Sequence, residues 1–275
     1  MADNIEKIFM DIKGVERIRE LIHSRLGIHI KEGKESLLRQ RLWKLIQSGD
    51  FKDLHAICDA IEQAKDSSLL LRLATLISTN HTYFFREVAH FNYLKKNVLP
   101  NIKPTQGGIR MWSAASSSGE EAYTMCMVLA DAMGLDSFKR DISILGTDIS
   151  QKVLKIAEEG IYTKDSVSQI PGNMRMSYTE NISPDLIRIK PVLRSACLFR
   201  RLNLNVGQYP FKKKFHVVFC RNVFIYFDMK TQEKICREFA RVASPDAWLF
   251  ISQTETLRNL DVPWAYVRPG IYKKR

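Results

Sequence analysis

The stretch Ile109–Met133, IRMWSAASSSGEEAYTMCMVLADAM, decides the fold of this chain. It predicts a buried strand over 109–115, a turn of small residues over 116–119, and then a helix that begins with two glutamates. Apolar residues recur along that helix at the spacing of one face, at Ala122, Met125, Cys126, Leu129, Ala132 and Met133. A strand that turns tightly into a helix forms the floor of nucleotide-sized sites in open α/β sheets. We therefore expect the functional site to lie here.

The composition is that of a globular protein with a real core. The chain has 275 residues, of which 45% are hydrophobic, enough for one large domain with or without a smaller companion. Its five cysteines are scattered, with no CxxC pair and no His at ligand spacing, so we expect neither a disulfide framework nor a metal site. Since no signal peptide and no apolar run of roughly 18 residues is found, we expect a cytoplasmic protein.

The chain is basic, and its positive charge is unevenly distributed. The formal net charge is +12, of which +3 falls in residues 1–100 and +9 in residues 101–275. The segment 175–214 alone holds nine basic and two acidic residues. Such a local excess predicts an acidic partner, which could be a nucleic acid, an anionic lipid surface or an acidic protein. The alternative is a solvated basic face that keeps the protein soluble.

Residues 1–90 predict a small helical domain, because apolar residues recur there three times at helical spacing. In its second helix Lys34, Arg41 and Lys44 share the face opposite the apolar one. This basic face could dock on an acidic helix of a partner, or it could be ordinary exposed surface.

The segment Asn80–Arg86, NHTYFFR, fits neither the helical nor the strand period. Its three consecutive aromatic residues between polar ones indicate a turn that lines a pocket. The alternative is an aromatic plug in the core at a domain junction.

Polar residues follow each later strand of the predicted sheet. Asp148 follows the strand 142–145, Asn203 follows 197–199, and the pair Arg221-Asn222 follows 215–220. A helix over 229–242, a strand over 247–252 and a hairpin with strands 264–268 and 271–273 complete the domain, and an irregular insert interrupts it at 160–196. Ligands of parallel sheets bind at the carboxyl ends of the strands, so these polar residues predict a ligand site.

The predicted ligand is a nucleoside with a positive charge. An acid after the second strand is where nucleoside binders hold ribose hydroxyl groups. The glycine fingerprint GxGxxG is absent, and the pair Glu120-Glu121 at a helix start would compete with a pyrophosphate for the positive end of the helix dipole.

In these motifs the chain resembles the CheR family of chemotaxis receptor methyltransferases, which use S-adenosylmethionine to esterify protein glutamate side chains. The motifs are NxTxFFR at 80–86, WSAASSSGEE at 112–121, DI at 148–149, GIY at 160–162, LNL at 202–204 and CRNVxIYF at 220–227. They occur in family order and cover nearly the whole chain. One departure is Gln253-Thr254-Glu255-Thr256, where many members carry Ser-Glu.

The resemblance implies a fold, a set of site residues and a cofactor. The expected fold is an all-α domain over 1–90, a linker over 91–108 and a Rossmann-like α/β class I methyltransferase domain over 109–275, with a small β-subdomain inserted at 160–196. The implied cofactor is S-adenosyl-L-methionine, with S-adenosyl-L-homocysteine as product. Its implied contacts are Asn80, Thr82, Arg86, Glu121, Asp148, Asn203, Leu204, Cys220 and Arg221. The implied catalytic edge contains Asn222 and Tyr226, to which the mechanism below adds Arg86.

Methyl transfer to a glutamate needs no general base, because a carboxyl with a pKa of about 4.3 is already ionised at neutral pH. Alignment of carboxylate, methyl and sulfur can then supply roughly 7 to 11 kcal/mol of the barrier reduction. Arg86 or Arg221 would lower the cost of taking the carboxylate out of water. We assign Arg86 to positioning of the cofactor carboxylate or the substrate, and Tyr226 to orientation through its hydroxyl group.

The expected partner is the cytoplasmic domain of chemoreceptors, in some members of the family reached through a receptor C-terminal tether peptide on the β-subdomain. We expect a monomer with no nucleic-acid partner and no membrane insertion. Two other functions remain open. A nucleic-acid methyltransferase would also need the cofactor and positive charge, but no Asx-Pro-Pro-aromatic motif follows the fourth strand. A scaffold that binds the cofactor without catalysis is the second.

Charge reversal at Arg41 and Lys44 is expected to slow receptor methylation, because a basic face speeds encounter with acidic receptor helices. The affinity for S-adenosylmethionine should be unchanged. The measurements are the rate of methyl-ester formation and the cofactor dissociation constant. An unaffected methylation rate would make this face ordinary solvated surface.

Overall fold

The chain divides into two units. The computed structural model describes residues 11–30, 33, 35–63, 68–77, 81–105 and 107–275. Contacts group residues 1–80 with 226–231 in a first unit, and residues 81–225 with 232–275 in a second. The division in the N-terminal half thus falls between residues 80 and 81, whereas we expected it at residue 90.

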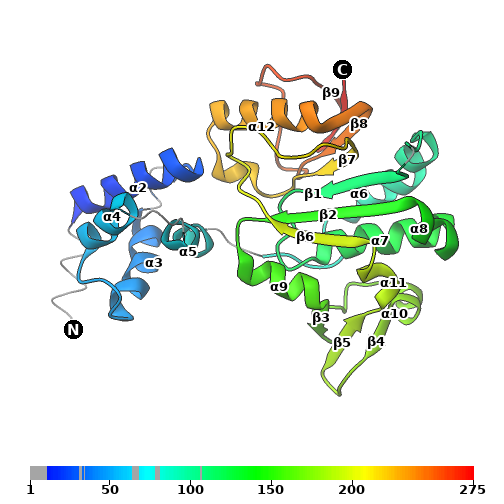
Figure 1. Cartoon of the computed structure of the whole chain (residues 1–275), viewed down its shortest axis with the longest axis horizontal. Helices are drawn as coiled ribbons and strands as arrows, with labels where there is room; N and C mark the ends of the chain where they lie inside the picture. The colour runs from blue at the N-terminus through cyan, green and yellow to red at the C-terminus, as the bar shows by residue number, and fades with distance from the viewer. Residues whose placement is uncertain (1–10, 31–32, 34, 64–67, 78–80, 106) are drawn as a thin grey trace. The chain divides into compact units, whose positions relative to one another are not determined.

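The first unit is helical. Its described helices are α2 (Ile12–Leu26), α3 (Glu35–Gln47), α4 (Leu54–Gln63) and α5 (Ser68–Ile77) (Figure 1). Most of the apolar residues that follow helical spacing are buried, namely Val15, Ile18, Ile22, Leu26, Leu38, Leu42, Leu45, Leu70, Leu73 and Ala74, whereas Leu21 and Ile46 are half-buried. Asp11 caps α2 by accepting a hydrogen bond from the backbone N–H of Gly14 at 2.8 Å. Of the basic face, Lys44 is exposed and Arg41 half-buried, while Lys34 lies outside the described residues.

The second unit contains a seven-stranded sheet with the order β6-β2-β1-β7-β8-β10-β9 (Figure 1). The strands are β1 (Ile109–Ser113), β2 (Ile142–Asp148), β6 (Cys197–Arg201), β7 (Phe215–Phe219), β8 (Ala243–Phe250), β9 (Trp264–Arg268) and β10 (Ile271–Lys274). The pairs from β6 to β8 are parallel, and β10 is antiparallel to both β8 and β9. The α/β sheet and the terminal hairpin are therefore confirmed. The strand order reverses between β1 and β7, where open sheets leave a crevice for a ligand.

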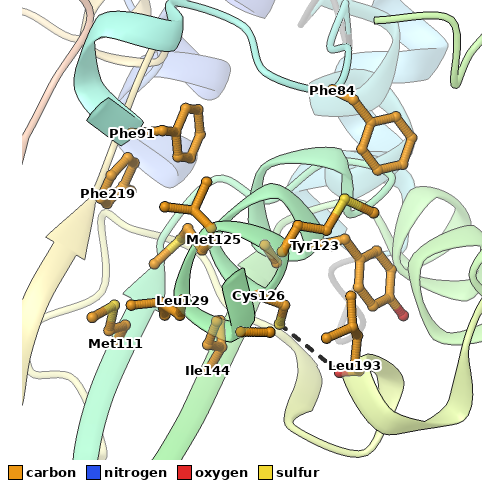
Figure 2. Close-up of a cluster of buried hydrophobic side chains, with 14 of the residues drawn as sticks. Phe84, Phe91, Met111, Tyr123, Met125, Cys126, Leu129, Ile144, Leu193 and Phe219 are labelled. Carbon is orange, nitrogen blue, oxygen red and sulfur yellow. Dashed lines mark hydrogen bonds between the residues drawn. The ribbon is translucent and has the colours of Figure 1, made fainter. Parts of the chain in front are cut away.

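Successive residues of β1 face opposite sides of the sheet. Met111 belongs to the main core, together with Met125 and Leu129 of α7 (Glu120–Met133) (Figure 2). Trp112 packs on the other face against Phe239 of α12 (Met229–Val242), with ring centroids 5.1 Å apart. Figure 1 accordingly shows α12 on one side of the sheet and α7, α8 (Leu135–Asp141) and α9 (Gln151–Glu159) on the other.

The irregular insert forms a small sheet of its own, the β-subdomain. Its strands β3 (Ile161–Thr163), β4 (Thr179–Asn181) and β5 (Leu186–Ile189) pair antiparallel in the order β3-β5-β4. Two short helices, α10 (Gly172–Tyr178) and α11 (Pro191–Arg194), flank these strands. The buried Ile189 and Leu193 join the main core, which ties the β-subdomain to the sheet domain.

The first part of the segment expected as a linker, up to Asn101, is helical and packs in the core. It contains α6 (Val88–Tyr93), a π-helical turn η1 (Leu94–Val98) and a 3₁₀ turn η2 (Leu99–Asn101). Phe91 stacks on Phe219 of β7 with ring centroids 5.5 Å apart (Figure 2). A third turn, η3 (Phe224–Tyr226), follows β7. Over the part of the chain that the structure describes, no helix is both long and apolar enough to cross a membrane.

Gly146 in β2 leaves no room for a side chain. A Cβ atom there would lie 2.4 Å from the Phe199 ring and 2.9 Å from Ser116 Oγ. Gly146→Ala should therefore lower the free energy of unfolding by about 1–3 kcal/mol. The matched control is Gly172→Ala, which meets no atom within 4 Å and should change that free energy by less than about 0.5 kcal/mol. Urea unfolding followed by circular dichroism measures both, and equal stabilities would contradict the expected clash.

Candidate functional site

The turn after β1 is held by the two neighbouring strands. The backbone N–H of Ala114 donates to Phe219 O at 2.7 Å, and that of Ser116 donates to Thr147 O at 2.8 Å. Ser117 and Gly119 both have left-handed backbones, with φ of 47° and 97°. A Cβ atom at residue 119 would lie 2.8 Å from Ala157 Cβ, so only glycine fits there. The turn therefore brings the start of α7 close to α9.

Asp148, at the end of β2, faces this turn. Its Oδ2 accepts a hydrogen bond from Ser117 N, and its Oδ1 accepts one from Ser150 N, each at 2.9 Å. Burial raises the pKa of the carboxyl above its usual value, although these hydrogen bonds favour the ionised form. The predicted ribose-binding acid is thus fixed at the carboxyl end of the sheet, with 9% of its surface exposed.

Three hydroxyl groups near Asp148 have no hydrogen-bond partner. The Oγ atoms of Ser116, Ser117 and Ser150 are all buried and unpaired. Buried polar groups are nearly always paired in folded proteins, so a cluster of unpaired ones indicates a polar ligand. Together with the Asp148 carboxylate they offer donors and acceptors that suit a sugar with free hydroxyl groups.

Arg221, directly after β7, lies between two carboxylates. Its Nη1 is 3.2 Å from Glu121 Oε2, and its Nη2 is 3.4 Å from Glu87 Oε2. Nη2 also donates to the carbonyl oxygen of Arg86, and the guanidinium lies over the ring of Phe91. Only 2% of the side chain is exposed, and its Nε has no hydrogen-bond partner. Both Nη atoms of the guanidinium therefore contact acceptors within the protein.

Glu121 begins α7 and faces the same space. Its Oε1 accepts a hydrogen bond from Ser113 Oγ at 2.6 Å, while Oε2 faces Arg221. Burial raises the pKa of this carboxyl, and the charge of Arg221 only partly offsets that effect. The neighbouring Glu120 accepts hydrogen bonds from Ser118 Oγ instead, at 2.9 and 2.8 Å. Glu121 shares its guanidinium partner, Arg221, with Glu87, so this carboxylate can still attract a second cation.

Glu87 completes this charged cluster. Its Oε1 accepts from Ser252 Oγ at 2.7 Å, and its Oε2 accepts from Gln253 N at 3.1 Å. Burial alone would raise its pKa, but Arg221 and these hydrogen bonds outweigh it and lower the pKa below the usual value. The residue thereby joins the start of α6 to the segment after β8.

Asn222 and Glu255 lie together beyond Arg221, in the segments after β7 and β8. Asn222 has a left-handed backbone, with φ of 59°, which asparagine tolerates better than most residues. Its N–H donates to Glu255 Oε2 at 3.2 Å, and the same oxygen accepts from Ser252 N at 2.8 Å. The segment that departs from the common family pattern thus supplies the carboxylate that holds Asn222.

The aromatic segment is partly a core plug and partly surface. Phe84 is fully buried and meets the ring of Tyr162 edge-on at 5.0 Å, whereas Tyr83 is exposed. The half-buried Arg86 donates from Nη1 to His81 O at 2.7 Å, and Thr82 is also half-buried. The expected pocket wall therefore does not include Phe84.

The remaining predicted site residues, so far as the structure describes them, do not form one cluster of contacts. Asn203 uses its Oδ1 to accept from Asn205 N at 2.9 Å, and Leu204 is buried. Cys220 is buried, which raises the pKa of its thiol well above the usual value. Tyr226 ends η3 and is grouped with the first unit, while Asn80 lies outside the described residues. No group of His, Cys, Asp and Glu within the described ranges could hold a metal ion.

Sequence reasoning missed Glu87, Ser113, Ser252 and Glu255 as members of this network. Glu87 and Glu255 stand outside the predicted strands and helices, so no periodicity indicates where their side chains go. Ser113 lies inside a strand, where its hydroxyl group gave no sign of facing Glu121. The one available signal was Glu87 itself, an acid directly after the NxTxFFR motif.

Comparisons with known proteins place the chain in a family. Residues 80–267 match the family model described as CheR methyltransferase, SAM binding domain, and residues 13–78 match the CheR methyltransferase, all-alpha domain. The chain is 37% identical over 268 residues to a chemotaxis protein methyltransferase of Borreliella burgdorferi, covering 94% of this chain and 93% of the relative. It is 31% identical over 259 residues to the chemotaxis protein methyltransferase of Escherichia coli, covering 93% and 88%.

His90 should make stability depend on pH. Burial and the charge of Arg221 lower its pKa from 6.5 to about 4, against the opposing effect of Glu87. The unfolded chain then binds more protons between these values, so stability falls as pH falls through this window. From pH 6.5 to 4.5 the loss attributable to His90 should be about 2 kcal/mol.

The test compares His90→Phe with the wild-type protein by urea unfolding across this pH range. The difference in unfolding free energy between them should vary with pH by that amount, whereas the exposed His81→Phe should follow the wild-type protein. A pH-independent difference for His90→Phe would show that His90 does not titrate in this way.

Proposed function

Because the chain belongs to the CheR family of S-adenosylmethionine-dependent methyltransferases, we propose that it methylates glutamate side chains of chemoreceptors. The products are glutamate methyl esters and S-adenosyl-L-homocysteine, and the role is sensory adaptation. The observation that carries the proposal is the pair of buried acids, Asp148 and Glu121, at the carboxyl ends of adjacent strand units. The serine hydroxyl groups beside Asp148 have no hydrogen-bond partner among the described residues, and Glu121 shares its guanidinium partner with Glu87. A cationic nucleoside would supply both the missing hydrogen bonds and a further positive charge.

The residues of the site fit the cofactor. Asp148 would hold the ribose hydroxyl groups, supported by the unpaired serine hydroxyl groups beside it. Glu121 would hold the ammonium group of the aminoacyl part. From the resemblance we also assign contacts to Asn80, Thr82, Arg86, Asn203, Leu204, Cys220 and Arg221. When bound, S-adenosylmethionine supplies an activated methyl group on a sulfonium centre.

The charge of the buried cluster supports a cationic ligand. When ionised, Glu87 and Glu121 carry two negative charges against the single positive charge of Arg221. The surplus negative charge lies at low exposure, where electrostatic attraction is stronger than in water. A pyrophosphate would be repelled from this place, whereas an ammonium or sulfonium group would be attracted.

The accepting carboxylate requires positioning and no proton removal. Arg221 is already shared by two carboxylates, so the half-buried Arg86 is the better guide for the substrate carboxylate or the cofactor carboxylate. We assign Asn222, held in a left-handed conformation by Glu255, to the catalytic edge. Tyr226 would orient the acceptor through its hydroxyl group.

The receptor contacts proposed are electrostatic. The basic segment 175–214 covers part of the β-subdomain, whose edge strands β3 and β4 could pair with a receptor tether peptide. The helical unit presents Lys44 on its exposed face. Acidic receptor helices would be drawn to both surfaces, and a monomer suffices for this chemistry.

The decisive experiment incubates the full chain with tritiated S-adenosylmethionine and chemoreceptor cytoplasmic fragments. Label should appear in receptor fragments and be released as methanol by mild base, the mark of a methyl ester. Transfer to RNA or DNA but not to receptors would favour a nucleic-acid methyltransferase. Cofactor binding without any transfer would favour a scaffold.

Asp148→Asn should raise the cofactor dissociation constant about 10- to 100-fold, because a hydrogen bond to a charged group contributes about 1.5–3 kcal/mol. The exposed Asp136→Asn in α8 is the matched control and should bind like the wild-type protein. Isothermal titration calorimetry with S-adenosylhomocysteine measures both. Wild-type affinity in Asp148→Asn would remove Asp148 from the cofactor site.

A further inference from the structure

We propose that Glu87 is a positioning residue for the cofactor: it shares Arg221 with Glu121, so that the guanidinium does not neutralise Glu121 alone and the cluster keeps a net negative charge that attracts the cofactor ammonium group. This inference rests on the proposed function, because it assumes S-adenosylmethionine as the ligand. Glu87 stands next to the NxTxFFR motif but is not part of it, and it is not expected to touch the cofactor.

The contacts of Glu87 are more numerous than a surface glutamate needs. Both of its oxygens accept hydrogen bonds, from Ser252 Oγ and from Gln253 N. Its Oε2 also lies 3.4 Å from Arg221 Nη2 and 3.3 Å from His90 Nδ1. The side chain is only 17% exposed. Its direction is thus fixed by β7, α6 and the segment after β8 together.

The backbone of Glu87 indicates that this placement is costly and maintained by its surroundings. Its φ is 54°, in the left-handed region that a glutamate rarely adopts. Such a conformation costs on the order of 1–3 kcal/mol and persists only where other contacts determine it. Here the contacts that determine it are those of the carboxylate, which the left-handed turn aims toward Arg221.

The consequence for the site follows from counting charges. With Glu87 present, one guanidinium serves two carboxylates, and its nearest approach to Glu121 is a single contact at 3.2 Å. Without the charge of Glu87, Arg221 and Glu121 would form a neutral pair. A neutral pair attracts an ammonium group less than a cluster with a net negative charge does. Glu87 therefore raises affinity for the aminoacyl part of the ligand in particular.

The rival explanation is that Glu87 merely clamps the segment after β8. The two can be separated with ligands that share the adenosine part and differ in the aminoacyl part. S-adenosylhomocysteine carries the amino acid, and 5′-methylthioadenosine does not. A loss of the net negative charge of the cluster weakens only the first, whereas a loosened fold weakens both.

The variants are Glu87→Gln, which removes the charge and keeps the shape, and Ser252→Ala, which removes one clamp contact and keeps the charge. Dissociation constants of both ligands are measured by competition with labelled S-adenosylmethionine. For Glu87→Gln we expect affinity for S-adenosylhomocysteine to fall about tenfold. Binding of 5′-methylthioadenosine should stay within about twofold, and Ser252→Ala should keep the wild-type ratio of the two constants.

Equal losses for both ligands in Glu87→Gln, or no loss for either, would overturn the proposal. So would a Ser252→Ala protein that reproduces the altered ratio. Thermal unfolding of each variant reports whether the fold is intact. The test is independent of the acceptor: a wild-type protein that binds both ligands but methylates no receptor would disprove the proposed function and leave this inference standing.

Discussion

The burial of Arg221 is the constraint on which the site depends. A guanidinium that is 2% exposed has lost its hydration, and an unpaired charge at such a place would cost several kcal/mol. It is compensated by Glu121 from the start of α7 and Glu87 from before α6, neither of which is near it in sequence. Three segments of the chain must therefore meet at one point. That point is the carboxyl end of the sheet, where the strand order reverses.

The turn after β1 lacks the glycine fingerprint that usually allows a close approach to a nucleotide. Gly119 is the one position of the turn where a side chain would collide with α9. The other turn residues are serines, and the hydroxyl groups of Ser116 and Ser117 are unpaired near Asp148. A phosphate-binding turn presents backbone N–H groups to its ligand. This turn instead presents serine hydroxyl groups and is followed by the carboxylates of Glu120 and Glu121. Its chemistry therefore suits a sugar and a cation.

The sequence was sufficient where a periodic element ends in a polar residue. Asp148 and Glu121 could be placed from the strand and helix patterns alone, because the carboxyl ends of parallel strands lie at one edge. The sheet, the helix 229–242 and the final hairpin were predictable for the same reason. Exact strand ends were less so: β8 covers Ala243–Phe250, whereas the pattern favoured 247–252.

What the sequence did not reveal are the contacts made by irregular segments. Glu87 and Glu255 reach the site through left-handed turns and loops, whose side-chain directions follow from tertiary contacts and not from a repeat. The aromatic segment shows the same limit: alternation could not tell that Phe84 enters the core while Tyr83 stays exposed. Part of the expected linker packs in the core because Phe91 stacks on Phe219, a contact between residues far apart in the chain.

The two arginines of the site illustrate why charge type alone does not assign a role. From the sequence, either Arg86 or Arg221 could lower the cost of taking a carboxylate out of water, and the positioning role was assigned to Arg86. In the structure Arg221 is shared by two protein carboxylates, whereas Arg86 is half-buried and donates to a backbone carbonyl. A guanidinium already held by two anions has little attraction left for a third. In the proposed function the two roles therefore follow from pairing: Arg221 would organise the cofactor side, and Arg86 would keep a charge available for a substrate carboxylate.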